Sequence, residues 1–266
     1  MPAANAQTPL FRGVGVALVT LFDDDGRLLI EQTVEHAGDL VDRGVQAVVV
    51  SGSTGESWAL DVDERLELCA AMSRALDGRV PTIVGAGHLD ASDAARLAGA
   101  GGEAGAAAVL ALSPPGEDDV RPHYEALAEA AAGLPVLGYH FPGISPPGIP
   151  VEVLSELPIA GCKDSSGDAE RLIAELDAYD GPLWVGSSAY LALAGPYGAT
   201  GAILALANTD PEGTITAFGG DVGAQRDLLD AHREGHADFP SGLKRRLARL
   251  RGTPAAVRPR AAATAR

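Results

Sequence analysis

A lysine closes a short apolar run near the middle of the chain. Lys163 follows residues 158–162 (PIAGC) and precedes the polar turn 164–167 (DSSG). Of the 20 basic residues, only Lys163 and Lys244 are lysines. Arginine serves a surface as well as lysine does but stays protonated, whereas a lysine in apolar surroundings can lose its proton. An uncharged amine forms imines with carbonyl compounds, so Lys163 is either the nucleophile of such a reaction or a chance surface lysine.

Two further polar groups follow apolar runs in the same way. Tyr139 closes the run 135–138, and the loop 52–56 (GSTGE) follows the run 47–51. Imine formation needs a positioned acid or base, for which Tyr139 is the candidate. A keto-acid carboxylate needs donors, which the loop offers through backbone N–H groups and the hydroxyls of Ser53 and Thr54. Alone, this loop could equally be an ordinary strand-to-helix turn.

Eight short β-like runs alternate with helical ones along the chain. They are mostly continuous apolar runs, which is typical of parallel strands buried on both faces. Aspartates at the starts of three helices, together with Glu64 and Pro211, are typical capping signals. The predicted strands are 14–20, 47–51, 82–85, 107–112, 135–139, 159–163, 183–186 and 201–204, and the capping aspartates are Asp61, Asp90 and Asp210.

Eight β/α units in about 250 residues match the number of units and the length that are typical of a closed barrel. We therefore predict an α/β protein, a (β/α)8 TIM barrel with a short C-terminal helical extension. Residues 1–266 would form one domain, with the barrel at about 13–208 and the helices at about 211–252. An open doubly wound sheet is the alternative, but no G-x-G-x-x-G follows the first strand, where the turn 21–26 carries three carboxylates instead.

Strand alternation predicts which side chains face the barrel interior. Alternate residues of a strand share a face, so Lys163 should share one with Gly161 and Ile159, while Cys162 faces the helices. Tyr139 would face inward from the preceding strand. Adjacent strands are about 4.8 Å apart, so the phenol and the amine can act on one substrate atom.

Composition excludes several classes of function. The net charge of −16 argues against a nucleic-acid partner. Two cysteines form no disulfide framework and lack metal-ligand spacing. No apolar run approaches the roughly 20 residues of a membrane span, and residues 1–9 lack the features of a secretory signal. We expect a cytoplasmic protein without cofactor or metal.

Together these residues resemble the dihydrodipicolinate synthase and N-acetylneuraminate lyase family, class I barrels that form Schiff bases with pyruvate. The resemblance runs from about residue 13 to about residue 259. The matching segments are 17–22 (ALVTLF), 52–57 (GSTGES), 139–143 (YHFPG), 161–168 (GCKDSSGD) and 198–208.

The resemblance implies a role for each candidate residue. Lys163 would form the imine with pyruvate or a longer 2-keto acid, and Tyr139 would be the acid/base. Ser53 and Thr54 would hold the carboxylate, with Thr54 also in the hydroxyl relay. The backbone of Ile203 would lie near the bound keto acid. The family implies a homo-oligomer, a dimer or tetramer, and no cofactor.

Two departures bear on the second substrate. Dihydrodipicolinate synthases carry an arginine at the position of Ile144 and a relay tyrosine at that of Gly116. We therefore predict an aldolase or lyase that cleaves or condenses a hydroxy-oxo acid or keto-deoxy sugar acid, with an aldehyde as the other half. The alternatives are dihydrodipicolinate synthase or a keto-acid dehydratase, and a catalytically impaired keto-acid-binding barrel.

The remaining polar residues are interpreted structurally. Lys244 lies on an arginine-rich helix and is expected at the surface. Glu56 is expected to cap the following helix. His88 could face the barrel mouth, but a capping or solvent-facing role is favoured. His232 and His236 have i,i+4 spacing without the other marks of a metal site.

Overall fold

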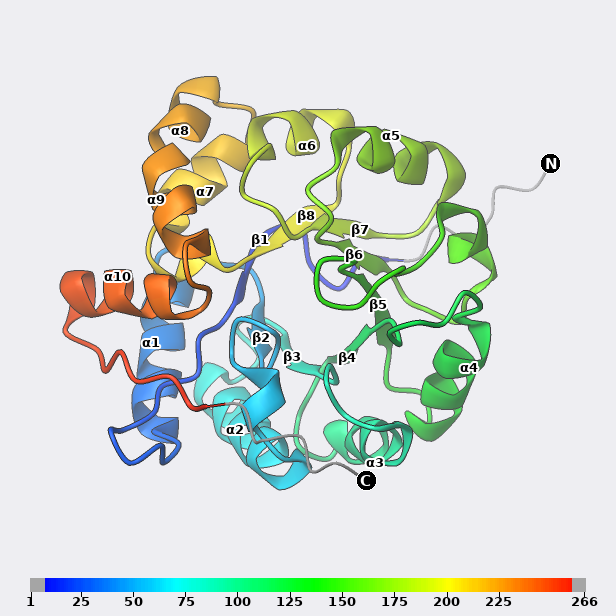
Figure 1. The fold of residues 1–266 in the computed structure, drawn as a ribbon, viewed down its shortest axis with the longest axis horizontal. Helices are drawn as coiled ribbons and strands as arrows, with labels where there is room; N and C mark the ends of the chain where they lie inside the picture. The colour runs from blue at the N-terminus through cyan, green and yellow to red at the C-terminus, as the bar shows by residue number, and fades with distance from the viewer. Residues whose placement is uncertain (1–7, 260–266) are drawn as a thin grey trace.

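Eight parallel strands close into a barrel in the order of the chain (Figure 1). The structure is a computed structural model that describes residues 8–259. The first strand pairs with both the second and the eighth, which excludes the open doubly wound sheet. The predicted TIM barrel is confirmed. The strands are β1 (Gly13–Ala17), β2 (Val48–Val50), β3 (Thr82–Gly85), β4 (Ala108–Leu112), β5 (Val136–His140), β6 (Cys162–Asp164), β7 (Leu183–Val185) and β8 (Gly201–Leu204).

Helices occupy the connections and form the outer ring (Figure 1). The last three α-helices, α8 to α10, follow the eighth β/α unit as a C-terminal extension. The α-helices are α1 (Ile30–Asp42), α2 (Val62–Leu76), α3 (Ala91–Gly101), α4 (Arg121–Ala130), α5 (Ala169–Ala178), α6 (Leu191–Tyr197), α7 (Pro211–Phe218), α8 (Val222–Asp227), α9 (Leu229–His236) and α10 (Ser241–Arg251). Three short 3-10 helices are η1 (Ser57–Ala59), η2 (Val151–Glu156) and η3 (Leu206–Asn208).

The predicted helix starts are confirmed by their capping bonds. The Asp61 carboxylate accepts from the Glu64 N–H at 2.9 Å, and the Glu64 carboxylate accepts in return from the Asp61 N–H. Asp90 and Asp210 accept from the first turns of α3 and α7. These bonds satisfy N–H groups that a helix leaves without partners, so local sequence fixes where these three helices begin.

Apolar side chains fill two layers, one inside the barrel and one between the strands and the helices. The inner layer includes Leu137, Tyr139, Trp184 and Ile203. The outer layer is larger and contains Cys162, which packs toward the helices as predicted. Because strand residues alternate between the layers, the barrel has a solid floor beneath its carboxyl end.

The sixth strand differs from its prediction. β6 begins at Cys162, whereas the sequence predicted a strand from residue 159. Gly161 has a φ of +152°, and this bend interrupts the alternation. The prediction that Ile159 shares the face of Lys163 was therefore wrong, because Ile159 packs in the outer layer.

Two further predictions concern a secretory signal in residues 1–9 and membrane-spanning segments. Most of the N-terminal segment on which the absence of a secretory signal was predicted, residues 1–9, lies outside the described residues. Within residues 8–259, no helix is both long and apolar enough to cross a bilayer. The C-terminal segment 252–259 runs from α10 past α1 toward α2 (Figure 1).

A substitution at Gly161 tests how tightly the start of β6 is packed. A Cβ atom there would lie 2.5 Å from the Trp184 ring and 2.8 Å from the Pro182 carbonyl oxygen. We expect Gly161→Ala to lower the free energy of unfolding by about 1–3 kcal/mol, measured by denaturant titration. Gly38→Ala is the control, because a Cβ at that helical position meets nothing within 4 Å. Equal unfolding midpoints for the two variants would contradict the packing described here.

Candidate active site

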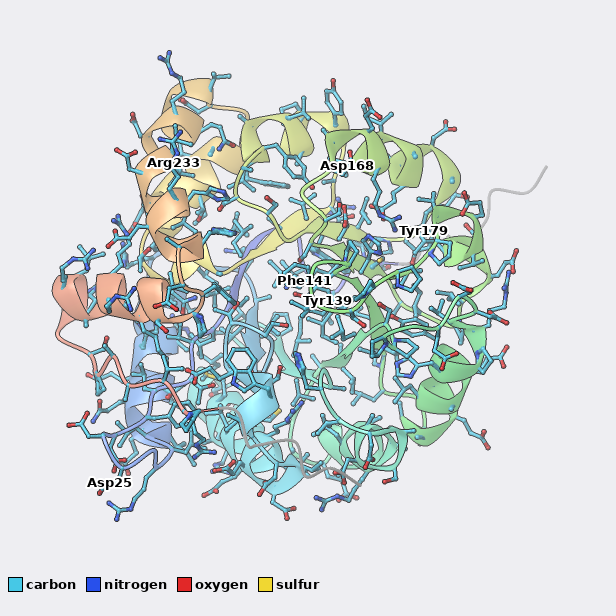
Figure 2. All side chains as sticks on the ribbon, in the orientation of Figure 1. Asp25, Tyr139, Phe141, Asp168, Tyr179 and Arg233 are labelled. Carbon is cyan, nitrogen blue, oxygen red and sulfur yellow. The ribbon has the colours of Figure 1, made fainter. Side chains whose placement is uncertain are left out.

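Lys163 and Tyr139 lie side by side inside the carboxyl end of the barrel. They are direct partners in the register of β5 and β6. The Lys163 Nζ lies 4.2 Å from the centroid of the Tyr139 ring. Their exposed fractions are only 4% and 5%. Figure 2 shows Tyr139, together with Phe141, near the centre of the barrel. The sequence-predicted pairing of amine and phenol is thus present in the structure.

The surroundings of the Lys163 amine are apolar and closely packed. Lys163 pairs in register with Trp184 of β7, whose side chain belongs to the inner apolar layer. Gly186 passes so close that a Cβ there would lie 3.0 Å from the Lys163 Cε. Among residues 8–259, no carboxylate lies within 4.0 Å of the Lys163 Nζ.

The loop 52–56 is held at the same end of the barrel. Ser53 and Thr54 are largely buried, with exposed fractions of 9% and 5%. The Thr20 hydroxyl donates to the Gly55 carbonyl oxygen at 2.8 Å. Gly85 of β3 admits the loop, because a Cβ there would lie 2.5 Å from the Ser51 carbonyl oxygen. The loop is therefore held against the segment that follows β1 and against β3.

Ile203 faces the interior of the barrel. It is fully buried in β8, within the inner apolar layer, and pairs in register with Gly15 of β1.

A cavity of about 360 Å³ opens above these residues, and we call it the mouth cavity. Ser53 lies in its wall, and so does Phe141, whose ring centroid is 5.8 Å from that of Tyr139. The cavity therefore begins beside the candidate residues and extends toward solvent. Its lining residues are Ser53, Trp58, His88, Phe141, Ile144, Phe239, Pro240, Ser241, Val257, Arg258 and Pro259.

The position of Lys244, the second lysine, shows that two predictions were wrong. Lys244 was expected at the surface, yet it is fully buried and forms an ion pair with Glu56. Glu56 was expected to cap a helix, but its carboxylate binds Lys244 and accepts from the Arg258 N–H at 2.8 Å. Lys244 also donates to the Ala256 carbonyl oxygen at 2.6 Å. The only available signal in the sequence was the same as for Lys163, a lysine among arginines.

Burial dominates the electrostatics of this pair. It raises the pKa of the Glu56 carboxyl and lowers the pKa of the Lys244 ammonium, because desolvation outweighs the mutual attraction. Glu56 sits at the end of the loop 52–56 with a φ of +58°. The ion pair therefore joins the loop that carries Ser53 and Thr54 to α10 and the segment 252–259.

The histidines occupy structural positions. His88 is exposed in a loop, with its Nδ1 2.9 Å from the Ser57 hydroxyl, and lines the mouth cavity. His140 points away from the interior, accepts from the Ile149 N–H, and has a pKa lowered to about 4 by burial. His232 lies 2.8 Å from the Ser188 hydroxyl. Within residues 8–259, no group of His, Cys, Asp or Glu could hold a metal ion.

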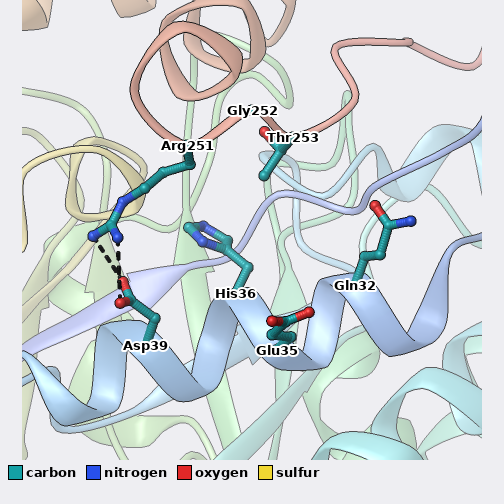
Figure 3. Close-up of a pocket in the computed structure, with 7 residues that line it drawn as sticks. All are labelled: Gln32, Glu35, His36, Asp39, Arg251, Gly252 and Thr253. Atoms are coloured by element: carbon teal, nitrogen blue, oxygen red, sulfur yellow. Dashed lines mark hydrogen bonds and ion pairs between the residues drawn. The ribbon is translucent and has the colours of Figure 1, made fainter.

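A larger cavity than the mouth cavity lies elsewhere. It has a volume of about 480 Å³ and lies between α1 and residues 251–253, outside the strands (Figure 3). Arg251 and Asp39 form an ion pair of 2.8 Å in its wall. Burial lowers the pKa of His36 there to about 4. None of the residues predicted to do chemistry lines this cavity, so it is not the candidate active site.

Known proteins are similar to this chain in sequence and in fold. The model of the dihydrodipicolinate synthetase family matches residues 10–250. The chain belongs to this family.

Relatives cover much of the chain. A 4-hydroxy-tetrahydrodipicolinate synthase of Parasynechococcus marenigrum is 32% identical over 92% of this chain and 81% of its own length. One of Corynebacterium aurimucosum is 39% identical over 62% of this chain, and the match spans only 57% of that relative. These matches confirm the predicted family and its lyase class.

Solved structures share the fold. A prophage protein of the dihydrodipicolinic acid synthase family from E. coli K12, in complex with pyruvate, has a TM-score of 0.88 at 23% identity, covering 96% of this chain and 93% of that one. Dihydrodipicolinate synthase of Acinetobacter baumannii, also complexed with pyruvate, has a TM-score of 0.82 at 25% identity, covering 89% and 87%. The roles of individual residues in this chain stay predictions.

The buried Glu56–Lys244 pair can be tested by a double-mutant cycle. Lys244→Met leaves a buried carboxylate unpaired and should lower the free energy of unfolding by about 3–5 kcal/mol. Adding Glu56→Gln should restore part of the loss, since it removes the unpaired charge. Denaturant unfolding gives both values.

The control on the same helix is Arg249→Met, which breaks an exposed pair with Glu234. It should cost at most about 1 kcal/mol. If Lys244→Met behaves like this control, or if the double variant is no more stable than Lys244→Met, the buried pair does not hold the loop.

Proposed function

We propose that the protein is a class I aldolase or lyase that carries pyruvate or a related 2-keto acid as an imine on Lys163. One observation carries the proposal: the Lys163 amine is buried, with no counter-ion among residues 8–259, 4.2 Å from the centroid of the Tyr139 ring, inside a barrel of this family. Pyruvate is bound in two of the similar solved structures, which supports the same keto acid here.

Imine formation uses both residues. The neutral amine attacks C2 of the keto acid, and the carbonyl oxygen takes up a proton to give a carbinolamine. This oxygen then leaves as water when a second proton reaches it, and the C=N bond forms. Tyr139 is the proposed acid/base that moves these protons, since its ring lies directly against the amine.

The loop 52–56 would hold the keto-acid carboxylate. Ser53 and Thr54 offer backbone N–H groups and hydroxyls at the carboxyl end of the strands, and Thr54 would also belong to the hydroxyl relay. Ile203 would lie near the bound keto acid through its backbone. The fixed shape of the loop supports this role, because pre-formed donors need no reorganisation when the anion binds.

The candidate enzyme classes differ in the reaction that follows imine formation. An aldolase would cleave or form a C–C bond between the keto acid and an aldehyde. Dihydrodipicolinate synthase is the second candidate, because the relatives of this chain carry that name. Ile144, where those enzymes would have arginine, favours the aldolase or a dehydratase.

We also propose a cellular location and an oligomeric state for the enzyme. We place it in the cytoplasm, supported by two buried free cysteines. We expect a homo-oligomer, a dimer or tetramer, as the family resemblance implies, and no cofactor.

Borohydride trapping tests the imine. Incubation with pyruvate and borohydride should give a reduced adduct that mass spectrometry of peptides locates on Lys163. The chain has only one other lysine, so Lys163→Met should abolish the lysine adduct, while Lys244 serves as an internal control. Absence of an adduct on Lys163 would end the Schiff-base proposal. An adduct without turnover of any keto acid would instead support an impaired keto-acid-binding barrel.

Tyr139→Phe tests the acid/base. The substitution keeps the ring beneath the amine and removes only the hydroxyl, so imine formation should slow by about 100-fold or more. The rate of adduct formation under rapid borohydride quench measures it, and circular dichroism checks the fold. Tyr179→Phe removes a hydroxyl at the edge of the barrel (Figure 2) and should leave the rate unchanged. An undiminished rate in Tyr139→Phe would remove Tyr139 from the mechanism.

A further inference from the structure

The wall of the mouth cavity is built mainly from apolar side chains. They come from four separate parts of the chain: η1, the loop after β5, the link between α9 and α10, and the C-terminal segment. These side chains are Trp58, Phe141, Ile144, Phe239, Pro240, Val257 and Pro259. Cavities lined by apolar and aromatic groups with a few polar ones are typical of small-molecule sites.

Two of these side chains are exposed although they are large and apolar. Ile144 is 37% exposed and Phe239 is 38% exposed. Each comes from a different segment, yet both line the same cavity. Exposed apolar area of this kind is removed from water when an apolar ligand binds, which stabilises the complex.

The cationic group in this wall is already engaged. The Arg258 guanidinium donates to the carbonyl oxygens of Gly26 and Ala59 and forms an ion pair with Glu64 at 2.8 Å. It also lies over the Phe22 ring, 4.4 Å from the centroid. Arg258 is therefore held among protein partners. The described part of the cavity therefore presents no guanidinium or ammonium group that could bind a carboxylate of the second substrate.

The cavity is placed where a second reactant must arrive. Lys163 and Tyr139 are buried inside the carboxyl end of the barrel, so an electrophile can approach the imine only from that end. Ser53 links the two regions, because it is the proposed carboxylate donor and also lines the cavity. Phe141 links them a second time through its ring contact with Tyr139.

We propose that the mouth cavity binds the electrophilic half of the substrate and that this half is a small, uncharged, apolar aldehyde, of the size of a single aromatic ring. The volume of about 360 Å³ lies near the lower end of the usual range for ligand cavities, about 300–1,000 Å³. The inference rests on the proposed function and narrows it, because a keto-deoxy sugar acid would bring hydroxyls rather than an apolar surface to this wall.

The bond changes balance without any other reactant. The imine of pyruvate loses a proton from C3 to give an enamine, whose C3 forms a bond to the aldehyde carbon. The aldehyde oxygen takes up a proton and becomes a hydroxyl. Water then hydrolyses the imine and releases a 4-hydroxy-2-keto acid and the free amine. The reverse sequence breaks the same C–C bond.

A matched pair of aldehydes tests the substrate class. Benzaldehyde and 4-carboxybenzaldehyde share a ring and a reactive group and differ by one carboxylate. With pyruvate, the wild-type enzyme should condense benzaldehyde with a kcat/KM at least tenfold higher. Equal rates, or a preference for 4-carboxybenzaldehyde, would overturn the inference.

One substitution should reverse the preference. Ile144→Arg places a guanidinium in the cavity wall and should raise the kcat/KM for 4-carboxybenzaldehyde relative to benzaldehyde by tenfold or more. Ile173→Arg is the matched control, because Ile173 is 49% exposed on α5 and lies outside the cavity. It should leave the ratio unchanged. An unchanged ratio in Ile144→Arg would mean that this wall does not contact the electrophile.

Pyruvate trapping distinguishes failure of the proposed function from failure of this inference. If borohydride traps pyruvate on Lys163 but benzaldehyde is not preferred, the inference fails and the proposed function stands. If no adduct forms on Lys163, the proposed function fails and the inference falls with it.

Discussion

The structure depends on the pairing of β5 and β6 within a closed ring of hydrogen bonds. This register places the Lys163 amine over the Tyr139 ring without help from any loop. Because the ring has no free edge, neither strand can slip by one residue without turning its side chains to the opposite face. The geometry that imine chemistry needs is therefore a property of the barrel itself.

The two lysines of the chain show how surroundings decide the role of a residue type. Both are buried, with exposed fractions of 4% and 0%. Lys244 meets the Glu56 carboxylate and lies 4.7 Å from the centroid of the Phe22 ring, so its charge is used to hold Glu56 and the loop beside it. Lys163 also lies over an aromatic ring, that of Tyr139, but no carboxylate among residues 8–259 lies within 4.0 Å of its Nζ. A lysine paired with a carboxylate and a lysine without such a partner among the described residues thus lie at the same end of one barrel.

Much of the fold could be predicted from the sequence because its signals are local. Apolar runs gave the eight strands, and capping aspartates such as Asp61 gave helix starts. The prediction failed at Ile159, where the bend at Gly161 breaks the alternation. It failed again at Lys244 and Glu56, which meet only after the whole barrel has formed between them. The mouth cavity could not be predicted for the same reason, since four distant segments build its wall.

In the proposed mechanism, Lys163, Tyr139 and the loop 52–56 act on one keto acid. A crystal structure of the borohydride-reduced pyruvate adduct tests it most directly. In that structure we expect C2 of the former pyruvate to be bonded to the Lys163 Nζ, with the carboxylate held by Ser53 and Thr54 and the Tyr139 hydroxyl within hydrogen-bonding distance of the new C–N unit. A carboxylate bound away from Ser53 and Thr54, or an adduct on any other amine, would contradict it.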